Sequence, residues 1–186
     1  MNIDGTNSKQ LTKGLAESLA VISPDGRWVV YSSAGTSRPT IWKISIDGGE
    51  PVEITKRVST SPLISPDGKS IAYLYPEAPD PTTPPNRIAI MSFDGGEPFA
   101  TFGFQPAGTV QTNAQWSSDG KSILYTTNTN NVTNIWSQPI DGGPPKQVTD
   151  FKDSFMTGFA WSRDGMRLVC SRGIFNRDAV LISENK

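Results

Sequence analysis

The sequence predicts an all-β chain built from one repeated unit of four short strands. A phrase close to S-P-D-G recurs four times, with its Asp at positions 25, 67, 119 and 164. A second phrase, Ile/Phe-Asp-Gly, recurs with its Asp at positions 4, 47, 94 and 141. The two interleaved signals share a period of about 45 residues, which is typical of a four-stranded propeller blade. We therefore expect a β-propeller of about four antiparallel blades.

The first strand of each unit leads into the S-P-D-G phrase, which has the chemistry of a tight turn. Pro presets φ, Asp accepts local hydrogen bonds, and Gly adopts the left-handed conformation. Ser118 and Arg163 replace the Pro in the last two units, which a type I turn tolerates. The aspartates are therefore expected to form turns and not to act as paired catalytic carboxylates. The first strands end at equivalent residues, of which the two Trp are expected to pack between blades: Ile22, Ile64, Trp116 and Trp161.

Three further strands complete each unit. The second strand alternates around Tyr31, Tyr73, Tyr125 and Cys170, and the third reads TIWKISI, RIAIMSF, NIWSQPI or DAVLISE. Asp-Gly-Gly follows the first three of these, which is a strong hairpin signal. The fourth strand reads PVEIT or PKQVT, whereas Phe102 takes the place of the final Thr in the second unit. No helical periodicity interrupts this pattern.

The expected blades are 13–57, 58–103, 104–150, and 151–186 joined by 1–12. Residues 1–12 read as the end of a unit, while 151–186 read as a unit without its fourth strand. Two alternatives follow. Either the N-terminal strand completes the last blade and closes a small four-bladed ring, or the chain is part of a larger propeller. In the second case, open blade edges would favour self-association.

The phrases SPDGKSIAY and IWKISIDGGEPVEIT resemble the WD40-like repeat of TolB-type β-propellers over almost the whole chain. Similar repeats form the propellers of prolyl oligopeptidase-type peptidases and of bacterial Ser/Thr kinases and winged-helix regulators. The resemblance implies the propeller fold. It also favours a periplasmic or otherwise extracytoplasmic location for a bacterial protein, although the N-terminus lacks the pattern of a secretory signal.

Composition and charge exclude several classes of partner. The chain has 17 basic and 18 acidic residues, and no basic run is longer than a pair. Nucleic acid is therefore not an expected partner, because binding phosphates requires clustered Lys and Arg. No apolar run approaches the 18 residues or so of a membrane span, so no membrane insertion is expected. Cys170 is the only cysteine, which excludes an internal disulfide.

The sequence also argues against catalysis and bound cofactors. It contains no His, which removes the usual general base, the Ser-His-Asp and Cys-His arrangements and the commonest metal ligand. No G-x-S-x-G, P-loop or C-x-x-C motif occurs, and no D-x-D-x-D spacing suggests calcium. We therefore expect no enzymatic activity, no metal and no cofactor.

The variable loops mark the candidate binding face. The S-P-D-G and D-G-G turns share one face, whereas the loops at 33–39, 76–87, 102–113, 127–133 and 150–158 share the other and differ between units. Binding residues tend to lie on irregular loops held by a rigid scaffold. The Pro-rich insert at 76–87 could present a stiff docking strip. The candidate partner-binding residues are Arg38, Arg87, Phe104, Asn130, Phe155 and Arg177.

Three functional hypotheses follow from these features. The first is a non-catalytic scaffold, similar to TolB, whose variable face binds a protein or peptide. The second is a sensory or accessory C-terminal propeller of a bacterial kinase or transcriptional regulator. The third is the propeller of a prolyl oligopeptidase-type peptidase without its hydrolase domain.

Overall fold

The computed structural model describes residues 4, 6–14, 16–35, 38–77, 86–104, 109–162 and 164–173, with only the backbone for 109–113. The regular secondary structure of these residues consists of β-strands alone, and each strand pairs antiparallel with its neighbour in the sheet. The strands form three four-stranded sheets and one two-stranded sheet, each in simple sequential order. The expected all-β propeller architecture is confirmed.

The sheets are named blade one to blade four in chain order. Blade one contains β1 (Glu17–Ile22), β2 (Trp28–Ser33), β3 (Thr40–Ser45) and β4 (Val52–Glu53). Blade two contains β5 (Thr60–Ile64), β6 (Ser70–Tyr75), β7 (Arg87–Ser92) and β8 (Ala100–Gly103). Blade three contains β9 (Thr109–Trp116), β10 (Ser122–Thr129), β11 (Val132–Pro139) and β12 (Lys146–Gln147). Blade four has two described strands, β13 (Phe155–Trp161) and β14 (Leu168–Gly173). The exact boundaries between blades stay a prediction.

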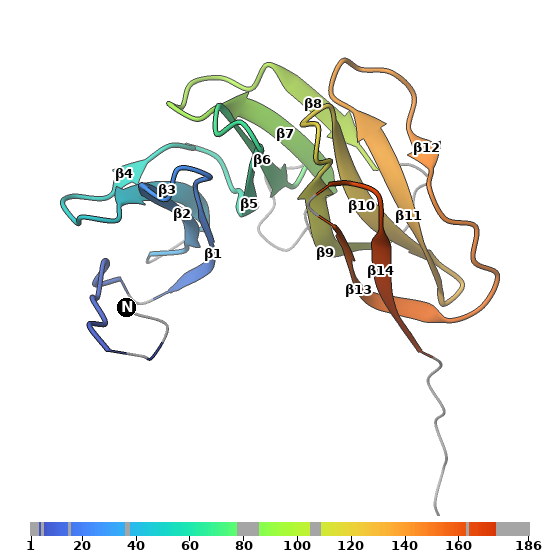
Figure 1. Cartoon of the computed structure of the whole chain (residues 1–186). Helices are drawn as coiled ribbons and strands as arrows, with labels where there is room; N and C mark the ends of the chain where they lie inside the picture. The colour runs from blue at the N-terminus through green and yellow to red at the C-terminus, as the bar shows by residue number, and fades with distance from the viewer. Residues whose placement is uncertain are drawn as a thin grey trace, which may run out of the picture.

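The four blades follow one another along an open arc (Figure 1). Blade one lies at one end of the arc and blade four at the other, with a wide separation between them. The described part of residues 1–12 lies at the blade-one end, where Lys9 Nζ donates a hydrogen bond to the Asp47 carbonyl at 2.5 Å. No strand from these described residues joins β13 and β14. The described blades therefore form an open arc, and closure of the fourth blade by the described part of 1–12 is not seen.

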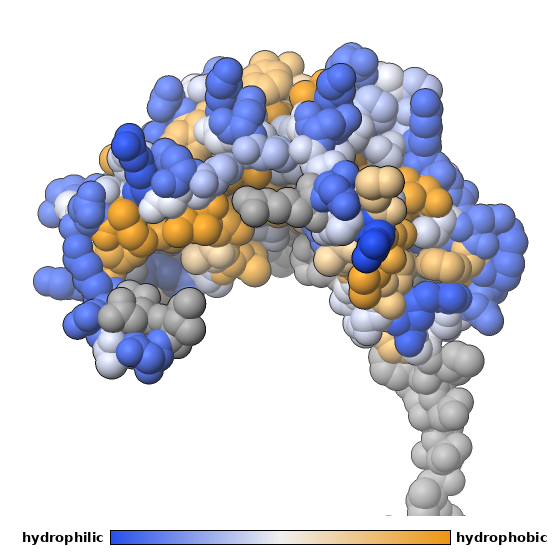
Figure 2. Space-filling model, viewed as in Figure 1, coloured by the Kyte–Doolittle hydropathy of each residue, from blue (hydrophilic) through white to orange (hydrophobic). Residues whose placement is uncertain are grey.

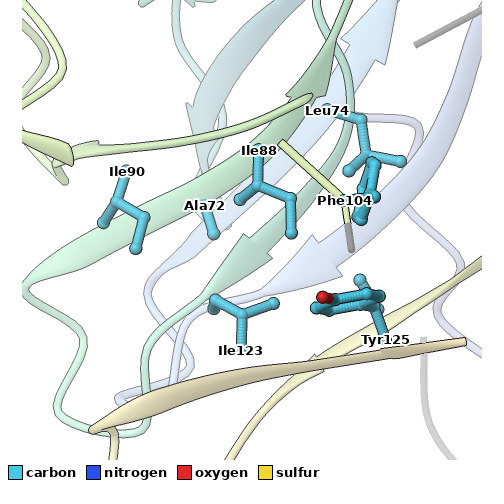
Figure 3. Packing of buried hydrophobic residues seen from close by; sticks show 8 residues of the cluster. Ala72, Leu74, Ile88, Ile90, Phe104, Ile123 and Tyr125 are labelled. Atoms are coloured by element: carbon cyan, nitrogen blue, oxygen red, sulfur yellow. The ribbon is translucent and has the colours of Figure 1, made fainter. Parts of the chain in front are cut away.

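Each of the three described cores joins two consecutive blades. Between blades two and three, Ile123 and Tyr125 of β10 point toward Leu74, Ile88 and neighbouring apolar side chains of blade two (Figure 3). Similar clusters join blades one and two and blades three and four. Burying each such aliphatic side chain contributes roughly 1.5–3 kcal/mol, so stacking between neighbours is the main source of stability.

Recurrent threonines hold the outer edge of the blades. Ile41 N donates to Thr55 Oγ1 at 2.8 Å in blade one, and Ile135 N donates to Thr149 Oγ1 at 2.9 Å in blade three. These hydroxyls satisfy strand amides where the fourth strand is only two residues long. The Thr at the end of PVEIT and PKQVT therefore has a structural role.

The first strand of each blade, which is the strand nearest the inner side of the arc, has an irregular register with the second strand. In blades one and two it includes a non-glycine residue with positive φ, Leu19 at 53° and Ser61 at 55°. Such bulges bend a strand and increase its twist. They recur where the strands approach the inner side of the arc, so they belong to the repeat.

Candidate functional site

The recurrent aspartates are turn residues, as expected. Asp67 Oδ1 accepts hydrogen bonds from Ser65 Oγ at 2.6 Å and from Lys69 N at 3.0 Å, while Ser70 N donates to Ser65 Oγ at 2.9 Å. The same network surrounds Asp25, Asp119 and Asp164. The serine hydroxyl first, and then the backbone amide, lower the pKa of each of these carboxyls below 3.8. They are ionised structural groups at neutral pH.

The variable-loop face contains a groove of about 730 Å³ at the junction of blades one and two. Three segments form it: the loop after β2, the connection from β4 to β5, and the start of the loop after β6. Its volume falls in the range of roughly 300–1,000 Å³ that is typical of ligand sites. We call it the junction groove, and its main lining side chains are Arg38, Trp42, Glu53, Lys56, Arg57, Tyr75 and Glu77.

A second hollow of about 450 Å³ adjoins the junction groove and lies between residues 52–57 and blade two. Glu53, Lys56, Arg57 and Tyr75 line both hollows. The second hollow continues over Tyr73 to the turn after β7 at residues 94–98. The two hollows therefore adjoin each other, and Tyr73 and Tyr75 are among the residues that line them.

Charged groups in the groove are mostly paired, with one exception. Lys56 Nζ lies 2.7 Å from Glu53 Oε2, and the lysine hydrogen bond is the main reason that the pKa of Glu53 is lowered. The Arg87 guanidinium lies 2.7 Å from Glu77 Oε1. Within the described part of the chain, no hydrogen bond or ion pair of the Arg57 guanidinium is found. Arg57 is exposed and lies where the two hollows meet, so it can bind an incoming anion.

Arg57 also influences the neighbouring phenol. Burial raises the pKa of Tyr73 above 10.0, a negative Tyr75 would raise it further, and the positive charge of Arg57 opposes the shift. Tyr75 OH accepts a hydrogen bond from Arg87 Nε at 3.2 Å. Tyr73 is therefore a neutral hydrogen-bonding group at neutral pH, close to the Arg57 cation.

The structure brings two of the sequence-predicted residues to this site. Arg38 lines the junction groove, and Arg87 lies at its edge through Tyr75 and Glu77. Asn130 lies elsewhere, in a separate hollow of about 320 Å³ on blade three.

The other predicted residues are not in the groove. Phe104 is buried and packs edge-on against Tyr125 with ring centroids 5.0 Å apart, so its side chain belongs to the core. Phe155 is half-buried in β13, beside Gly173. Arg177 lies outside the described residues.

Sequence reasoning missed Arg57, Trp42 and Tyr75 as groove residues. The connection at 54–59 is short and was not among the variable loops. One signal could have found it, since Lys56 and Arg57 are the only adjacent pair of basic residues in the chain. Trp42 and Tyr75 gave no such signal, because each lies in a strand and not in a loop that differs between units.

Two other features of the described residues bear on chemistry. No group of three or more His, Cys, Asp or Glu side chains that could hold a metal ion occurs among them. The same residues include no helix with the length and apolar character needed to span a membrane.

No family model matches the sequence. Among curated proteins, an uncharacterized protein of Agrobacterium fabrum is 28% identical over 131 residues, which is 67% of this chain and 45% of that protein. The uncharacterized peptidase YuxL of Bacillus subtilis is 28% identical over 169 residues, which is 87% of this chain and 23% of that protein. The chain thus spans less than half the length of either relative.

Solved structures show the same architecture. A protein described as a TolB of Agrobacterium tumefaciens matches with a TM-score of 0.67 and 23% identity, covering 88% of this chain and 59% of that one. TolB of Acinetobacter baumannii matches with a TM-score of 0.62 and 24% identity, covering 83% and 37%. A chain in a nidogen/laminin complex matches with a TM-score of 0.61 and 15% identity, covering 82% and 55%. By its fold, this chain is a WD40-like β-propeller of the kind found in TolB.

Proposed function

We propose that the chain is a non-catalytic scaffold that binds a protein or peptide through the junction groove. The observation that carries the proposal is the exposed Arg57 guanidinium at the meeting point of two continuous hollows. The preferred ligand is an extended peptide segment with a carboxylate for Arg57 and an apolar or aromatic side chain for Tyr75 and Trp42. Arginine suits carboxylates because its planar fork can donate two parallel hydrogen bonds.

The scaffold supports such a role. The loops that line the groove are held by blades one and two, whose shared core includes the fully buried Val30 and Ile71. A rigid frame reduces the entropy lost when a partner binds. The absence of His from the sequence favours binding over acid–base chemistry.

A peptide-display selection on the immobilised chain tests the proposal. Selected peptides should contain acidic residues and should bind the Arg57→Glu variant at least about 10-fold more weakly, since a charge-assisted hydrogen bond contributes roughly 1.5–3 kcal/mol. Lys69→Glu is the matched control, because Lys69 is an exposed cation on the opposite, turn-bearing face. Equal affinity of the selected peptides for wild type and Arg57→Glu, or no enriched peptide at all, would contradict the proposal.

A second candidate function is that of the propeller part of a peptidase. The similarity to YuxL over 87% of the chain favours it. Under this proposal the groove would receive peptide segments on their way to a hydrolase outside these residues. Purified chain should then bind the selected peptides and leave them intact in a mass-spectrometric cleavage assay, whereas cleavage would contradict a non-catalytic role.

A further inference from the structure

The second hollow is lined by one positive and one negative side chain without an ion pair. Its charged lining residues in the described part of the chain are Glu53, Lys56, Arg57, Asp94 and Glu97. Lys56 Nζ lies 2.7 Å from Glu53 Oε2, and Asp94 Oδ1 lies 3.6 Å from Lys43 Nζ. Among the described residues, neither the Arg57 nor the Glu97 side chain has an ion pair or a hydrogen bond. Both charges are therefore available to a ligand.

The two unpaired charges lie on either side of the hollow's entrance from the junction groove. Arg57 lines both hollows, whereas Glu97 lines only the second one, in the turn after β7. Burial is the main reason that the pKa of Tyr73 is raised, but the positive charge of Arg57 lowers it and the negative charge of Glu97 raises it. Both groups therefore lie near the Tyr73 hydroxyl. The hollow is positive where it meets the junction groove and negative at its far end.

The turn that contains Glu97 leaves space for a ligand. Gly95 and Gly96 precede it with φ of 98° and 106°, a conformation that favours glycine. A Cβ at Gly96 would meet no described atom within 4 Å, and a Cβ at Gly95 would meet only the Ile54 carbonyl, at 3.9 Å. Glu97 itself is exposed. Its carboxylate can therefore pair with a cation that enters the hollow.

The rest of the hollow offers uncharged surface between the two charges. Tyr73, Ala89 and Thr101 of blade two line it, together with Val52 of blade one, which is 49% exposed. Figure 2 shows hydrophilic side chains beside apolar patches over blades one and two. Such a surface favours a peptide with both charged and apolar groups over a wholly apolar ligand, because an apolar ligand would leave the buried charges unpaired.

We propose that the peptide bound in the junction groove is dipolar, with a carboxylate at Arg57 and a lysine or arginine side chain at Glu97. This inference rests on the proposed function and adds the charge pattern of its ligand. A peptide with acidic groups alone would place a negative charge beside Glu97, and such like-charge contacts exclude wrong partners. Glu97 is therefore a specificity-determining residue, and Arg57 is the anchor.

Peptide display on the immobilised chain, followed by affinity measurements, tests the charge pattern. Selected peptides should contain Lys or Arg at one preferred offset from their acidic residue. Glu97→Lys should bind them at least about 5-fold more weakly, because it replaces an attraction by a repulsion, and the difference should shrink at high salt. Glu50→Lys is the matched control and should bind them as wild type does. Glu50 is the exposed repeat equivalent of Glu97 on blade one, and it lines neither hollow.

A charge-swapped variant gives the sharper result. Arg57→Glu combined with Glu97→Arg should bind peptides in which the acidic and basic residues are exchanged, and this recovery shows that the variant is folded. If selected peptides lack a basic residue and bind Glu97→Lys as tightly as wild type, yet still depend on Arg57, the dipolar ligand is overturned and the peptide-binding function stands. A swapped variant that binds neither peptide order also overturns the charge pattern. If no peptide is enriched, both proposals fail.

Discussion

The four S-x-D-G turns repeat the same contacts side chain by side chain. In each, the Asp carboxylate accepts a hydrogen bond from the serine hydroxyl two residues before it and from the backbone amide two residues after it. The glycine after each Asp has φ between 68° and 73°, a conformation that side chains with a Cβ rarely adopt. These contacts lie within six consecutive residues, which is why the sequence alone could predict them.

Replacing Asp67 by Ala should lower the free energy of unfolding by about 1 kcal/mol at pH 7, because two local hydrogen bonds are lost. The folded state lowers the pKa of Asp67 below 3.8, so this stabilisation is fully present above that pH. It is lost as the pH falls through the lower, folded value. Urea unfolding of wild type and variant from pH 7 down into the acid range measures the difference.

Asp47→Ala is the control for this experiment, since within the described residues no hydrogen bond to its carboxylate is found. At pH 7 it should lower the free energy of unfolding by less than Asp67→Ala does, because it removes no hydrogen bond to a carboxylate. A pH-independent difference for Asp67→Ala would show that the carboxylate does not stabilise the turn.

The contacts of the buried Lys43 side chain could not be predicted from the sequence. Lys43 Nζ donates to the Phe93 carbonyl at 3.0 Å and lies 3.6 Å from Asp94 Oδ1. It also lies 5.3 Å from the centre of the Trp28 ring. The equivalent positions in blades two and three are Ile90 and Ser137, so the repeat gives no hint of this contact. It depends on how blade one packs on blade two.

At the scale of the strands, the equivalent residues Trp116 and Trp161 differ in whether the indole N–H has a hydrogen-bond partner. Trp116 at the end of β9 donates from Nε1 to the Leu63 carbonyl of blade two at 3.1 Å. Trp161 at the end of β13 is equivalent, but its Nε1 is buried with no hydrogen-bond partner among the described residues. Both residues pack between blades, as the sequence predicted. Only the first also joins two blades by a hydrogen bond.

Trp116→Phe should therefore cost more stability than Trp161→Phe. Both variants replace an indole by a phenyl ring, but only the first leaves the Leu63 carbonyl without its indole donor. The expected additional loss is about 1 kcal/mol in the free energy of unfolding. Chemical denaturation of the two variants measures it directly. Equal losses would mean that the Trp116 hydrogen bond contributes nothing to the junction.

The inner-strand bulges lay beyond what strand periodicity could predict. Alternation of apolar and polar residues identifies a strand. It does not show whether that strand contains an extra residue relative to its partner strand. Leu19 and Ser61 are ordinary strand residues by type, although their backbone is left-handed. The bulge depends on how each strand approaches its neighbours on the inner side of the arc.

At the scale of the whole molecule, the repeat predicted the blades well and the binding site only in part. Strand order within a blade follows from local turns, so the period was enough to obtain it. The junction groove brings together loops from two blades. The sequence could therefore identify as binding residues only those on loops that differ between repeat units, such as Arg38 and Arg87. Phe104 is on such a loop but enters the core, because an apolar side chain at a blade junction packs against the neighbouring sheet.

The most direct test of the account concerns which blades touch. Methyl cross-relaxation in an isoleucine-labelled sample should connect blade one with blade two, through Ile41 or Ile54 and Ile71. It should likewise connect blade two with blade three, through Ile88 or Ile90 and Ile123. The account predicts no connection between the isoleucines of blades one and three. Cross-peaks from Ile41 or Ile54 to Ile123 would instead indicate sheets stacked face to face and would contradict a propeller.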